Sequence, residues 1–367
     1  MIGQKRIPSR EGGVEIVVEE ISKRMVKRGH KVVCYNRRGQ HVSGKAYTTQ
    51  VLTEYEGIDI KSVFTIERKG FAAFTASFFA SVKAAFGKFD VVHYHAEGPC
   101  IMCFLPKLFG KRIIATIHGL DWQRAKWSKF ATIIIKFGEK MAVKHADEII
   151  VLSRNVQRYF KNTYNRDTVF VPNGVEKVQF VEADLITKRW GLKKDNYILF
   201  LGRIVPEKGL KYLIDAYKNL NTDKKLVIAG GASDSRAYYD EIIKSLDGMD
   251  NVVLTDFIQG RELSELFSNA YIYVLPSDLE GMPISLLEAM SYGNCCLVSD
   301  IPECGEVIED KAILFQRGDS ESLRSKLQML CDNEDIVKNY KLTASDFICK
   351  KYNWDRVVDK TLELYNN

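Results

Sequence analysis

The sequence lacks any apolar run long enough to cross a bilayer. Its longest apolar stretch, residues 71–82, contains one threonine and two serines and is too short for a transmembrane helix. Residues 1–10 are polar and basic, unlike a secretory signal peptide. The eight cysteines form no regular framework and lie mostly in apolar context, as in residues 294–297, so we expect reduced thiols in the core. These absences predict a cytoplasmic chain rather than a secreted or membrane-spanning one.

Two signatures of nucleotide-binding enzymes are also missing. Neither Gly12-Gly13 nor Gly202 completes a GxGxxG fingerprint, which counts against a nicotinamide dehydrogenase. No DxD motif occurs, although some enzymes that use nucleotide sugars hold a divalent ion with that motif. Cys100 and Cys103 form a single CxxC without a second pair, so packing in the core is the favoured interpretation. We therefore expect no metal and no cofactor.

Charge is distributed unevenly along the 367 residues, which are too many for one ordinary core and suggest two domains. Residues 1–175 contain 29 Lys and Arg against 15 Asp and Glu, whereas residues 176–367 contain 24 against 32. The basic first half is expected to meet an anionic partner: a membrane surface, a phosphorylated lipid or nucleic acid. Nucleic acid is the weakest of these, because the sequence contains no recognisable nucleic-acid-binding module.

Apolar runs of strand length alternate with helical patterns along most of the chain. The predicted strands cover residues 31–35, 90–95, 112–118, 148–153, 168–172, 197–201, 225–229, 251–255, 271–275, 295–299 and 312–315. This alternation predicts an α/β fold with doubly wound parallel sheets, which bind ligands at the carboxyl ends of their strands. We expect two tandem domains, 1–175 and 176–351, with a cleft between them and the charged segment 176–196 as the linker region. The first strand, at residues 1–3, is either unusually short or begins upstream.

The loop and helix after the predicted strand 271–275 carry two carboxylates. Gly281 and Pro283 predict a tight loop, from which a helix starts. Glu280 lies in this loop, and Glu288 lies about two turns further along, inside the helix. Free amides and the positive end of the helix dipole suit an anionic ligand such as phosphate. The carboxylates would then hold hydroxyl groups, those of a sugar at Glu280 and those of a ribose at Glu288.

A basic pair follows another predicted strand. Gly202 and Arg203 come directly after residues 197–201, and Lys208 opens the next helix. Arg binds phosphate oxygens through a bidentate fork and Lys acts as a point charge, so both can reach one diphosphate. A solvated basic loop is the alternative interpretation. The two carboxylates expected at the same edge of the sheet favour the diphosphate site.

The first half offers candidate residues for a second ligand. Gly12-Gly13 lies between the first strand and the first helix, where glycines either allow close approach to a ligand or simply form a turn. His118 ends a predicted strand, and a structural role is its alternative interpretation. Aromatic and charged residues follow it and could grip a sugar: Asp121, Trp122, Arg124 and Trp127. His93 and His95 have no carboxylates nearby in sequence, so a metal site is not expected there.

Phenylalanines recur at helical spacing in residues 71–86. They are Phe71, Phe74, Phe78, Phe79 and Phe86, and the basic residues beside them are Arg68, Lys69, Lys83 and Lys88. We interpret the segment as a helix that packs its aromatic face into the core. The alternative is an interfacial helix that lies on a membrane.

In combination, these motifs resemble one family. The tandem layout, residues 12–15 (Gly-Gly-Val-Glu), His118, Arg203 with Lys208, and Glu280 with Glu288 in E-x7-E spacing resemble the retaining glycosyltransferases of family 4, which have the GT-B fold of two Rossmann-like domains. Residues 172–175 (Pro-Asn-Gly-Val) match at the junction of the halves, and the similarity covers nearly the whole chain. Residues 1–10 and 118–127 most resemble members that extend bacterial surface polysaccharides, including rhamnosyltransferases. The usual start of the first strand is missing, and Gly119 stands where many members have Asp.

The resemblance implies roles for the matching residues. It implies that Arg203 and Lys208 neutralise the donor's diphosphate, that Glu280 holds donor-sugar hydroxyls and that Glu288 binds ribose. The residues expected to act in catalysis are His118, Arg203, Lys208 and Glu280. Those expected to bind the donor are Gly13, Gly202, Arg203, Lys208, Gly281, Met282, Pro283 and Glu288. Those expected to bind the acceptor are Gly12, Gly13, Glu15, Asp121, Trp122 and Arg124. The last helix, within residues 352–367, is expected to pack on the first domain.

The implied activity is the retaining, metal-independent transfer of a hexose or deoxyhexose from a nucleotide-diphosphate sugar. The implied acceptor is a glycan or a lipid-diphosphate saccharide in bacterial polysaccharide synthesis. The implied location of the enzyme is the cytoplasm, or the inner face of the cytoplasmic membrane as a peripheral protein. Two alternatives stay open. The chain could be a sugar-nucleotide epimerase or phosphorylase of the same fold, or a partner that binds a nucleotide sugar without catalysis.

Overall fold

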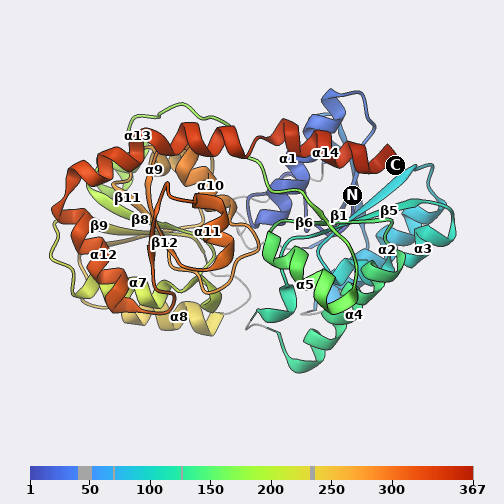
Figure 1. Ribbon diagram of the computed structural model, residues 1–367, viewed down its shortest axis with the longest axis horizontal. Coiled ribbons are helices and arrows are strands. Elements are labelled where there is room, and N and C mark those ends of the chain that lie inside the picture. Colours follow the sequence, from blue (N-terminus) through green and yellow to red (C-terminus); the bar gives the residue numbers. More distant parts are fainter. Residues whose placement is uncertain (40–51, 69–70, 125–126, 232–235, 367) are drawn as a thin grey trace. The chain divides into compact units, whose positions relative to one another are not determined.

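The computed structural model describes residues 1–39, 52–68, 71–124, 127–231 and 236–366. Lys69, one of the basic residues beside the phenylalanines, lies outside these ranges. The chain divides into two compact units (Figure 1): unit 1 comprises Met1–Gly174 and Trp354–Asn367, and unit 2 comprises Val175–Asn353. Each unit has its own hydrophobic core. The described residues contain no helix that is both long enough and apolar enough to cross a bilayer.

Unit 2 is built on a parallel sheet. Its strands are β8 (Tyr197–Leu201), β9 (Lys225–Ala229), β10 (Val252–Asp256), β11 (Ile272–Leu275), β12 (Cys295–Ser299) and β13 (Ile313–Phe315). Among the described residues they pair in the order β10-β9-β8-β11-β12-β13, with every pairing parallel. Burial on both faces explains their continuous apolar sequences. The strand order reverses between β8 and β11, and this switch point is where such sheets bind ligands.

Helices cover the unit 2 sheet. They are α6 (Leu185–Trp190), α7 (Leu210–Lys218), α8 (Arg236–Ser245), α9 (Gly260–Asn269), α10 (Ile284–Ser291), α11 (Pro302–Ile308), α12 (Ser320–Asp332) and α13 (Glu334–Lys351), with a short 3-10 turn, η4 (Pro206–Lys208), before α7. The core joins Phe200 of β8 to Leu213 of α7 and Leu323 of α12. Buried side chains recur at intervals of three or four residues in α7 and α12, which fixes the face that each helix turns to the core.

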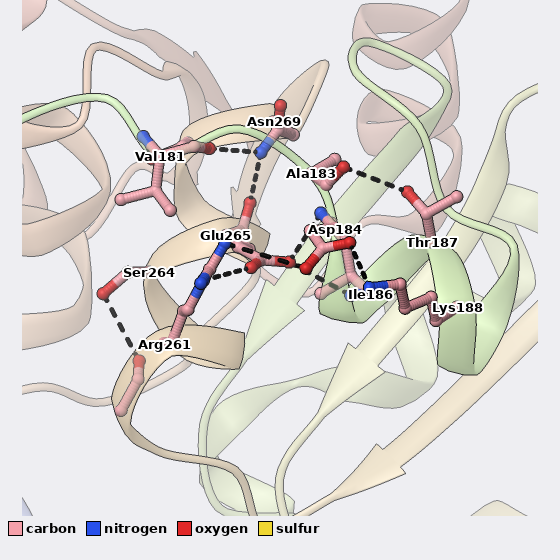
Figure 2. Close-up of polar contacts among 12 residues, drawn as sticks. Val181, Ala183, Asp184, Ile186, Thr187, Lys188, Arg261, Ser264, Glu265 and Asn269 are labelled. Carbon is pink, nitrogen blue, oxygen red and sulfur yellow. Dashed lines mark hydrogen bonds and ion pairs between the residues drawn. The ribbon is translucent and has the colours of Figure 1, made fainter.

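The segment 176–196, predicted as a linker region, belongs to unit 2 and is anchored to α9. One carboxylate oxygen of Glu265 accepts hydrogen bonds from the amides of Asp184 (3.0 Å) and Ile186 (3.1 Å), at the start of α6 (Figure 2). The side-chain amide of Asn269 donates to the carbonyl of Val181 at 2.8 Å. The segment is therefore part of unit 2, within the predicted domain 176–351, rather than a linker between the units. The contacts that hold it come from residues some 80 positions away in sequence, so the sequence pattern did not reveal them.

Unit 1 contains two sets of strands that a short N-terminal segment connects. The strands are β1 (Val33–Arg37), β2 (Glu54–Tyr55), β3 (Ile58–Val63), β4 (Val91–His95), β5 (Arg112–Ile117), β6 (Glu148–Val151) and β7 (Val169–Phe170). Within the described ranges they pair as β1-β3-β2 and as parallel β4-β5-β6-β7. Ile2 bonds to β4 through the carbonyl of His93 and the amide of His95, and Tyr35 of β1 donates to the carbonyl of Met1. The first strand is therefore a single bridge, between β1 and β4.

The helices of unit 1 include the C-terminal one. They are α1 (Gly13–Lys27), α2 (Phe71–Phe86), α3 (Phe104–Leu108), α4 (Lys129–His145), α5 (Arg154–Tyr164) and α14 (Trp354–Asn366), with 3-10 turns η2 (Gly98–Met102) and η3 (Asp121–Gln123). The helix α14 lies beside α1 in unit 1 (Figure 1), where Arg28 pairs with Asp359 at 2.6 Å. Arg112 of β5 donates to the carbonyl of Leu364 at 2.8 Å.

The aromatic face of α2 does not lie in the core, so the core-packing interpretation of its phenylalanines was wrong. The five phenylalanines Phe71, Phe74, Phe78, Phe79 and Phe86 are exposed. The buried face of α2 consists of alanines and serines. Small side chains let the helix approach the neighbouring elements closely, and the large side chains then remain outside.

Candidate active site

In unit 2, the loops after β8 and β11 meet at Lys208 and Glu280. The ammonium of Lys208 lies 2.6 Å from Oε1 of Glu280, and the hydroxyl of Ser277 donates to the same oxygen at 2.6 Å. The side chains of Lys208 and Glu280 are only 14% and 10% exposed. The second oxygen, Oε2, has no partner among the described residues, so Glu280 can still accept a hydrogen bond from a ligand hydroxyl.

Close backbone contacts hold these two loops together. Gly209 has φ +64°, and a Cβ atom there would lie 1.9 Å from the carbonyl oxygen of Pro276. Only glycine therefore fits where the β8 loop crosses the end of β11. The amide of Asp278 donates to the carbonyl of Glu207 at 2.9 Å, and Tyr212 donates to Asp278 at 3.0 Å. The position of Lys208 relative to Glu280 is thus fixed by backbone as well as by charge.

Arg203 lies in the same loop and is only partly exposed. Its guanidinium has no hydrogen bond or ion pair with the described residues, whereas Lys208 is paired. The loop beneath it is tightly packed, because a Cβ atom at Gly230 would lie 1.8 Å from the carbonyl oxygen of Gly202. A cationic group without a counter-ion, at the carboxyl edge of a parallel sheet, suits an incoming anion.

The second carboxylate, Glu288, lies on α10 as predicted and is partly buried. Burial raises the pKa of the Tyr273 phenol well above its usual value, and the charges of Glu280 and Glu288 raise it further. Both carboxylates therefore lie near this ring. Pro283 is the residue before α10, and its side chain caps none of the first amides of that helix. The loop residues Gly281, Met282 and Pro283 lead directly into that helix end.

Glu207 is a residue of this site that the sequence interpretation missed. It is 8% exposed, and neither carboxylate oxygen has a hydrogen-bond partner among the described residues. A buried carboxylate without a partner is costly unless a ligand or water satisfies it. Its place directly before Lys208 was the only signal in the sequence.

In unit 1, His118 contacts a second histidine. Nδ1 of His95 lies 3.0 Å from Nε2 of His118. Burial lowers the pKa of His118 to about 4; Asp121 opposes this effect and Arg124 adds to it. Burial also lowers the pKa of His95 well below its usual value. Both rings are therefore neutral at pH 7, and Nδ1 of His118 has no partner among the described residues, which leaves it available to a ligand.

His95 was not predicted as a site residue, because the 23 positions that separate it from His118 conceal their contact. It belongs to a buried chain of side chains that reaches α14. The ring of His95 stacks on that of His93 at 4.3 Å, and His93 bonds to Thr116 and to the hydroxyl of Tyr365, each at 2.7 Å. The C-terminal helix thus supports the histidines at the carboxyl ends of β4 and β5.

The predicted acceptor residues after His118 lie together but bond mainly to protein. Asp121 pairs with Arg124 at 2.9 Å, and the amide of Asp121 donates to Glu97 at 2.9 Å. The ammonium of Lys136 lies 3.9 Å from the centre of the Trp122 ring. A sugar that stacked on this face of Trp122 would therefore displace Lys136.

Gly12, Gly13 and Glu15 lie at the start of α1. Gly12 precedes the helix without a side-chain cap, and a Cβ atom there would lie 2.6 Å from Oε2 of Glu15. Glu15 is buried, and its carboxylate accepts a hydrogen bond from the amide of Lys5 at 2.8 Å. The structure therefore uses Glu15 to hold the loop before α1, which leaves it less free for an acceptor than Gly12 and Gly13.

Among the described residues, no group of three or more His, Cys, Asp and Glu side chains is arranged to hold a metal ion. Cys100 and Cys103 are buried in the core of unit 1, which confirms their predicted packing role. Their thiols donate to the carbonyls of Ala96 and Met141. The absence of a metal requirement stays a prediction.

Comparison with known proteins gives a consistent result for both halves of the chain. The model of the family described as Glycosyltransferase Family 4 matches residues 11–178, and that of Glycosyl transferases group 1 matches residues 183–345. The O-antigen chain mannosyltransferase RfbU of Salmonella typhimurium is 28% identical over 228 residues, which cover 61% of this chain and 62% of RfbU. An Escherichia coli UDP-Gal:alpha-D-GlcNAc-diphosphoundecaprenol alpha-1,3-galactosyltransferase is 26% identical over 295 residues, covering 76% and 75%.

Solved structures agree on the fold. HepE of Anabaena, solved in complex with UDP-glucose, superposes with a TM-score of 0.79 at 15% identity, covering 96% of each chain. The predicted α/β fold with two tandem Rossmann-like domains is confirmed. With one family model on each unit and this architecture, the chain belongs to the family 4 glycosyltransferases of the GT-B fold.

Proposed function

We propose that this glycosyltransferase moves a hexose or deoxyhexose from a nucleotide-diphosphate sugar to a glycan or lipid-linked saccharide, with retention of configuration, in bacterial polysaccharide synthesis. The observation that carries the proposal is the site at the switch point of unit 2. There, Lys208 and Glu280 pair at 2.6 Å and Arg203 lies in the same loop as Lys208. Two cations suit a diphosphate, and a carboxylate with one unused oxygen suits a sugar hydroxyl.

The donor binds to unit 2 in this proposal. Arg203 contacts the diphosphate as a bidentate donor, and Lys208 supplies a second positive charge. Glu280 is held through Oε1 by Lys208 and Ser277, so its Oε2 faces the donor sugar. Glu288, further along α10, binds the ribose hydroxyls, and the amides at Gly281, Met282 and the start of α10 contact phosphate.

The chemical step breaks the bond between the anomeric carbon and the diphosphate oxygen. Negative charge builds on the leaving diphosphate while the sugar ring becomes oxocarbenium-like, so fixed positive groups at the diphosphate stabilise the transition state. The acceptor hydroxyl attacks the anomeric carbon from the same face. Its proton passes to the departing phosphate oxygen, so that the products are the retained glycoside and the nucleoside diphosphate. Arg203 and Lys208 provide the charge stabilisation that a metal ion would otherwise give.

Unit 1 supplies the acceptor side and His118. Because His118 is neutral at pH 7, it can exchange a hydrogen bond with a sugar hydroxyl through Nδ1 without carrying a positive charge. Trp122 and the Asp121–Arg124 pair lie after His118 and are the proposed contacts of the acceptor. Gly12 and Gly13 allow a ligand to approach the start of α1.

The relatives suggest the chemical class of both substrates. HepE was solved with UDP-glucose, and the name of the Escherichia coli relative gives UDP-Gal as donor and GlcNAc-diphosphoundecaprenol as acceptor. We carry over the general class only: a nucleoside-diphosphate hexose or deoxyhexose, and a glycan or a saccharide on a lipid diphosphate. An acceptor of the second kind would place the enzyme at the inner face of the cytoplasmic membrane.

A two-step experiment tests the proposal. Melting temperatures with UDP, GDP, dTDP and their sugars identify the donor, because a ligand that binds only the folded state raises apparent stability. The selected donor is then incubated with and without glycan and lipid-linked acceptors, and NMR gives the configuration of the product. Acceptor-dependent transfer with retention supports the proposal. Conversion of the donor without acceptor would indicate an epimerase, and binding without turnover would indicate a non-catalytic partner.

A further inference from the structure

The helix α2 of unit 1 buries small side chains and exposes large aromatic ones, the reverse of an ordinary surface helix. Its buried face consists of small residues: Ala76, Ser77, Ala80, Ser81, Ala84 and Ala85. Its exposed face consists of phenylalanines, of which Phe71 is 59% exposed and Phe86 73%. A soluble surface normally shows scattered apolar side chains, so several large aromatic rings on one helix face indicate a binding surface.

The helix α4 shows the same inversion independently. Phe130, Ile133, Ile134 and Phe137 follow the spacing of a single helix face, and that face points outward: Phe130 is 71% and Ile133 66% exposed. The buried residues of α4 are Ile135, Gly138, Glu139 and Ala142. A continuous stripe of large apolar side chains outside, with a glutamate among the buried residues, is the reverse of the arrangement that water favours.

The two stripes are joined into one surface. Helices α2 and α4 both pack on η2, and α2 also packs on α3. An open groove of about 440 Å³ runs between them, lined by apolar side chains that include Phe74 and Phe78 of α2, Met102 of η2 and Phe137 of α4. We call this region, formed by the outer faces of α2, η2, α3 and α4, the apolar face.

The segment that contains the apolar face is rich in positive charge. Residues 68–145, which contain it, have 13 Lys and Arg against 4 Asp and Glu. Two of those four acids, Glu97 and Glu139, are fully buried and contribute no exposed negative group. The helix α4 carries Lys129, Lys140 and Lys144 at exposed positions beside its apolar stripe. Long lysine side chains can lie along an apolar layer and place their ammonium groups at its charged border.

We propose that the apolar face docks on a bilayer that contains anionic lipids. The phenylalanines and isoleucines insert at the boundary between head groups and acyl chains, and the lysines bind the negative head groups. A second copy of the chain fits less well, because a twofold interface would place the same cationic rims opposite each other. The proposal deepens the proposed function, since it assigns the surface from which a lipid-linked acceptor would be reached, but the docking itself does not require sugar transfer.

Sedimentation with vesicles tests the proposal on the full chain. Vesicles of phosphatidylcholine alone are compared with vesicles that include phosphatidylglycerol, at low salt and at about 0.5 M salt, where surface charge is screened. We expect binding to the anionic vesicles at low salt and a marked loss at high salt. Replacing Lys140 and Lys144 by Gln should weaken binding about fivefold per lysine.

Variants of the exposed apolar residues provide a second test in the same sedimentation experiment. Phe130→Ser with Ile133→Ser should remove most vesicle binding while the far-UV spectrum and melting temperature stay unchanged, because both side chains are largely in water. The matched control is Leu342→Ser, which changes a side chain that is 78% exposed on α13 of unit 2 and should leave binding intact.

The outcomes separate this proposal from the proposed function. If the protein transfers sugar to a water-soluble acceptor but does not sediment with anionic vesicles, docking is overturned and the activity stands. If it sediments and loses binding in the α4 variants but transfers no sugar, docking stands and the activity fails. Binding unchanged by the α4 variants overturns the apolar face as the docking surface. Self-association that the same variants abolish, without vesicle binding, shows instead that the face is a protein interface.

Discussion

The ammonium of Lys208 lies 2.6 Å from the carboxylate of Glu280, 72 positions later in the chain. The pair connects the loops after β8 and β11, the two strands between which the order of the unit 2 sheet reverses. Lys208 holds one oxygen of Glu280 and can also contact a phosphate, since an ammonium has three donors. In the proposed function, the cation for the diphosphate and the hydrogen-bond acceptor for the sugar are therefore positioned together before the donor arrives.

Replacement of Lys208 by Ala should reduce kcat/KM for transfer by about 10²–10³, the usual cost of removing one donor that stabilises developing charge. Steady-state kinetics with the selected donor measures the effect. The matched control is Lys211→Ala, three residues further along. Lys211 pairs with Glu241 on the surface, where both side chains are about half exposed, and its loss should hardly change turnover. Equal activity of the two variants would remove Lys208 from the catalytic site.

The carboxylate of Glu280 should contribute to catalysis by contacting the donor sugar rather than the phosphates. Glu280→Gln keeps the shape but weakens both the contact with Lys208 and the acceptor strength of Oε2. We expect a large fall in kcat with the nucleotide sugar and little change in affinity for the nucleoside diphosphate alone. Glu241→Gln serves as the control. A loss of nucleoside-diphosphate affinity as large as the loss of kcat would show that Glu280 acts by holding Lys208.

His118 should remain neutral throughout the physiological range. Burial lowers the pKa of His118 to about 4, below the unfolded value of about 6.5. The unfolded chain therefore takes up a proton that the native ring does not, so the stability from this group is present above about pH 6.5 and is lost as pH falls toward 4. NMR titration of the ring protons, assigned with His118→Asn, measures the native pKa. A ring that titrates near 6.5 would contradict the buried His95–His118 contact.

The carboxylate of Glu265 should stabilise unit 2. Burial alone would raise the pKa of Glu265, but hydrogen bonds from the amides of Asp184 and Ile186 and from Arg261 lower it overall. Glu265→Gln should reduce the free energy of unfolding by about 1–3 kcal/mol at pH 7. Because the native pKa is lowered, this difference is present above the unfolded pKa of about 4.3 and shrinks as pH falls through the native value.

Urea unfolding curves at several pH values measure the effect of Glu265→Gln. The control is Glu262→Gln on the same helix, whose partner Arg189 is half exposed, so the change should be about 0–1 kcal/mol. If both variants were equally stable at pH 7, the amide contacts of Glu265 would not anchor the segment before α6.

Transfer should continue in excess EDTA. Arg203 and Lys208 provide two positive charges at the proposed diphosphate site, so the leaving group is stabilised by side chains of the protein itself. Initial rates before and after dialysis against EDTA, with and without added Mg²⁺ or Mn²⁺, measure any requirement. Strict dependence on a divalent ion would contradict the mechanism proposed for these two residues.

Much of the fold could be predicted from the sequence because buried parallel strands have continuous apolar sequences. The predicted bounds of β8, β9 and β12 agree with the structure. The helix α6 was missed because it is short and charged, and the groups that fix it, Glu265 and Asn269, lie far along the chain. Periodicity in a sequence identifies an amphipathic segment, but it does not predict the tertiary contacts that position that segment.

Which face of a helix is buried, and which side chains meet in a site, depend on more than the sequence pattern. The spacing of the phenylalanines predicted the bounds of α2, yet the buried face is the one with alanines and serines, because close packing selected small side chains. The E-x7-E spacing identified Glu280 and Glu288 as candidates. The contacts Lys208–Glu280 and His95–His118 depend on strand order and on close approach of loops, such as that at Gly209, which spacing in one sequence does not reveal.

The most direct measurement is calorimetric titration of the selected nucleoside diphosphate, and of the same nucleoside without phosphates, into the wild-type protein and Arg203→Ala. We predict that the wild type binds the diphosphate far more tightly than the nucleoside and that Arg203→Ala removes most of this difference while melting at the same temperature. If Arg203→Ala bound the nucleoside diphosphate as tightly as the wild type, the diphosphate would not lie in the loop between β8 and α7, and the central claim would be wrong.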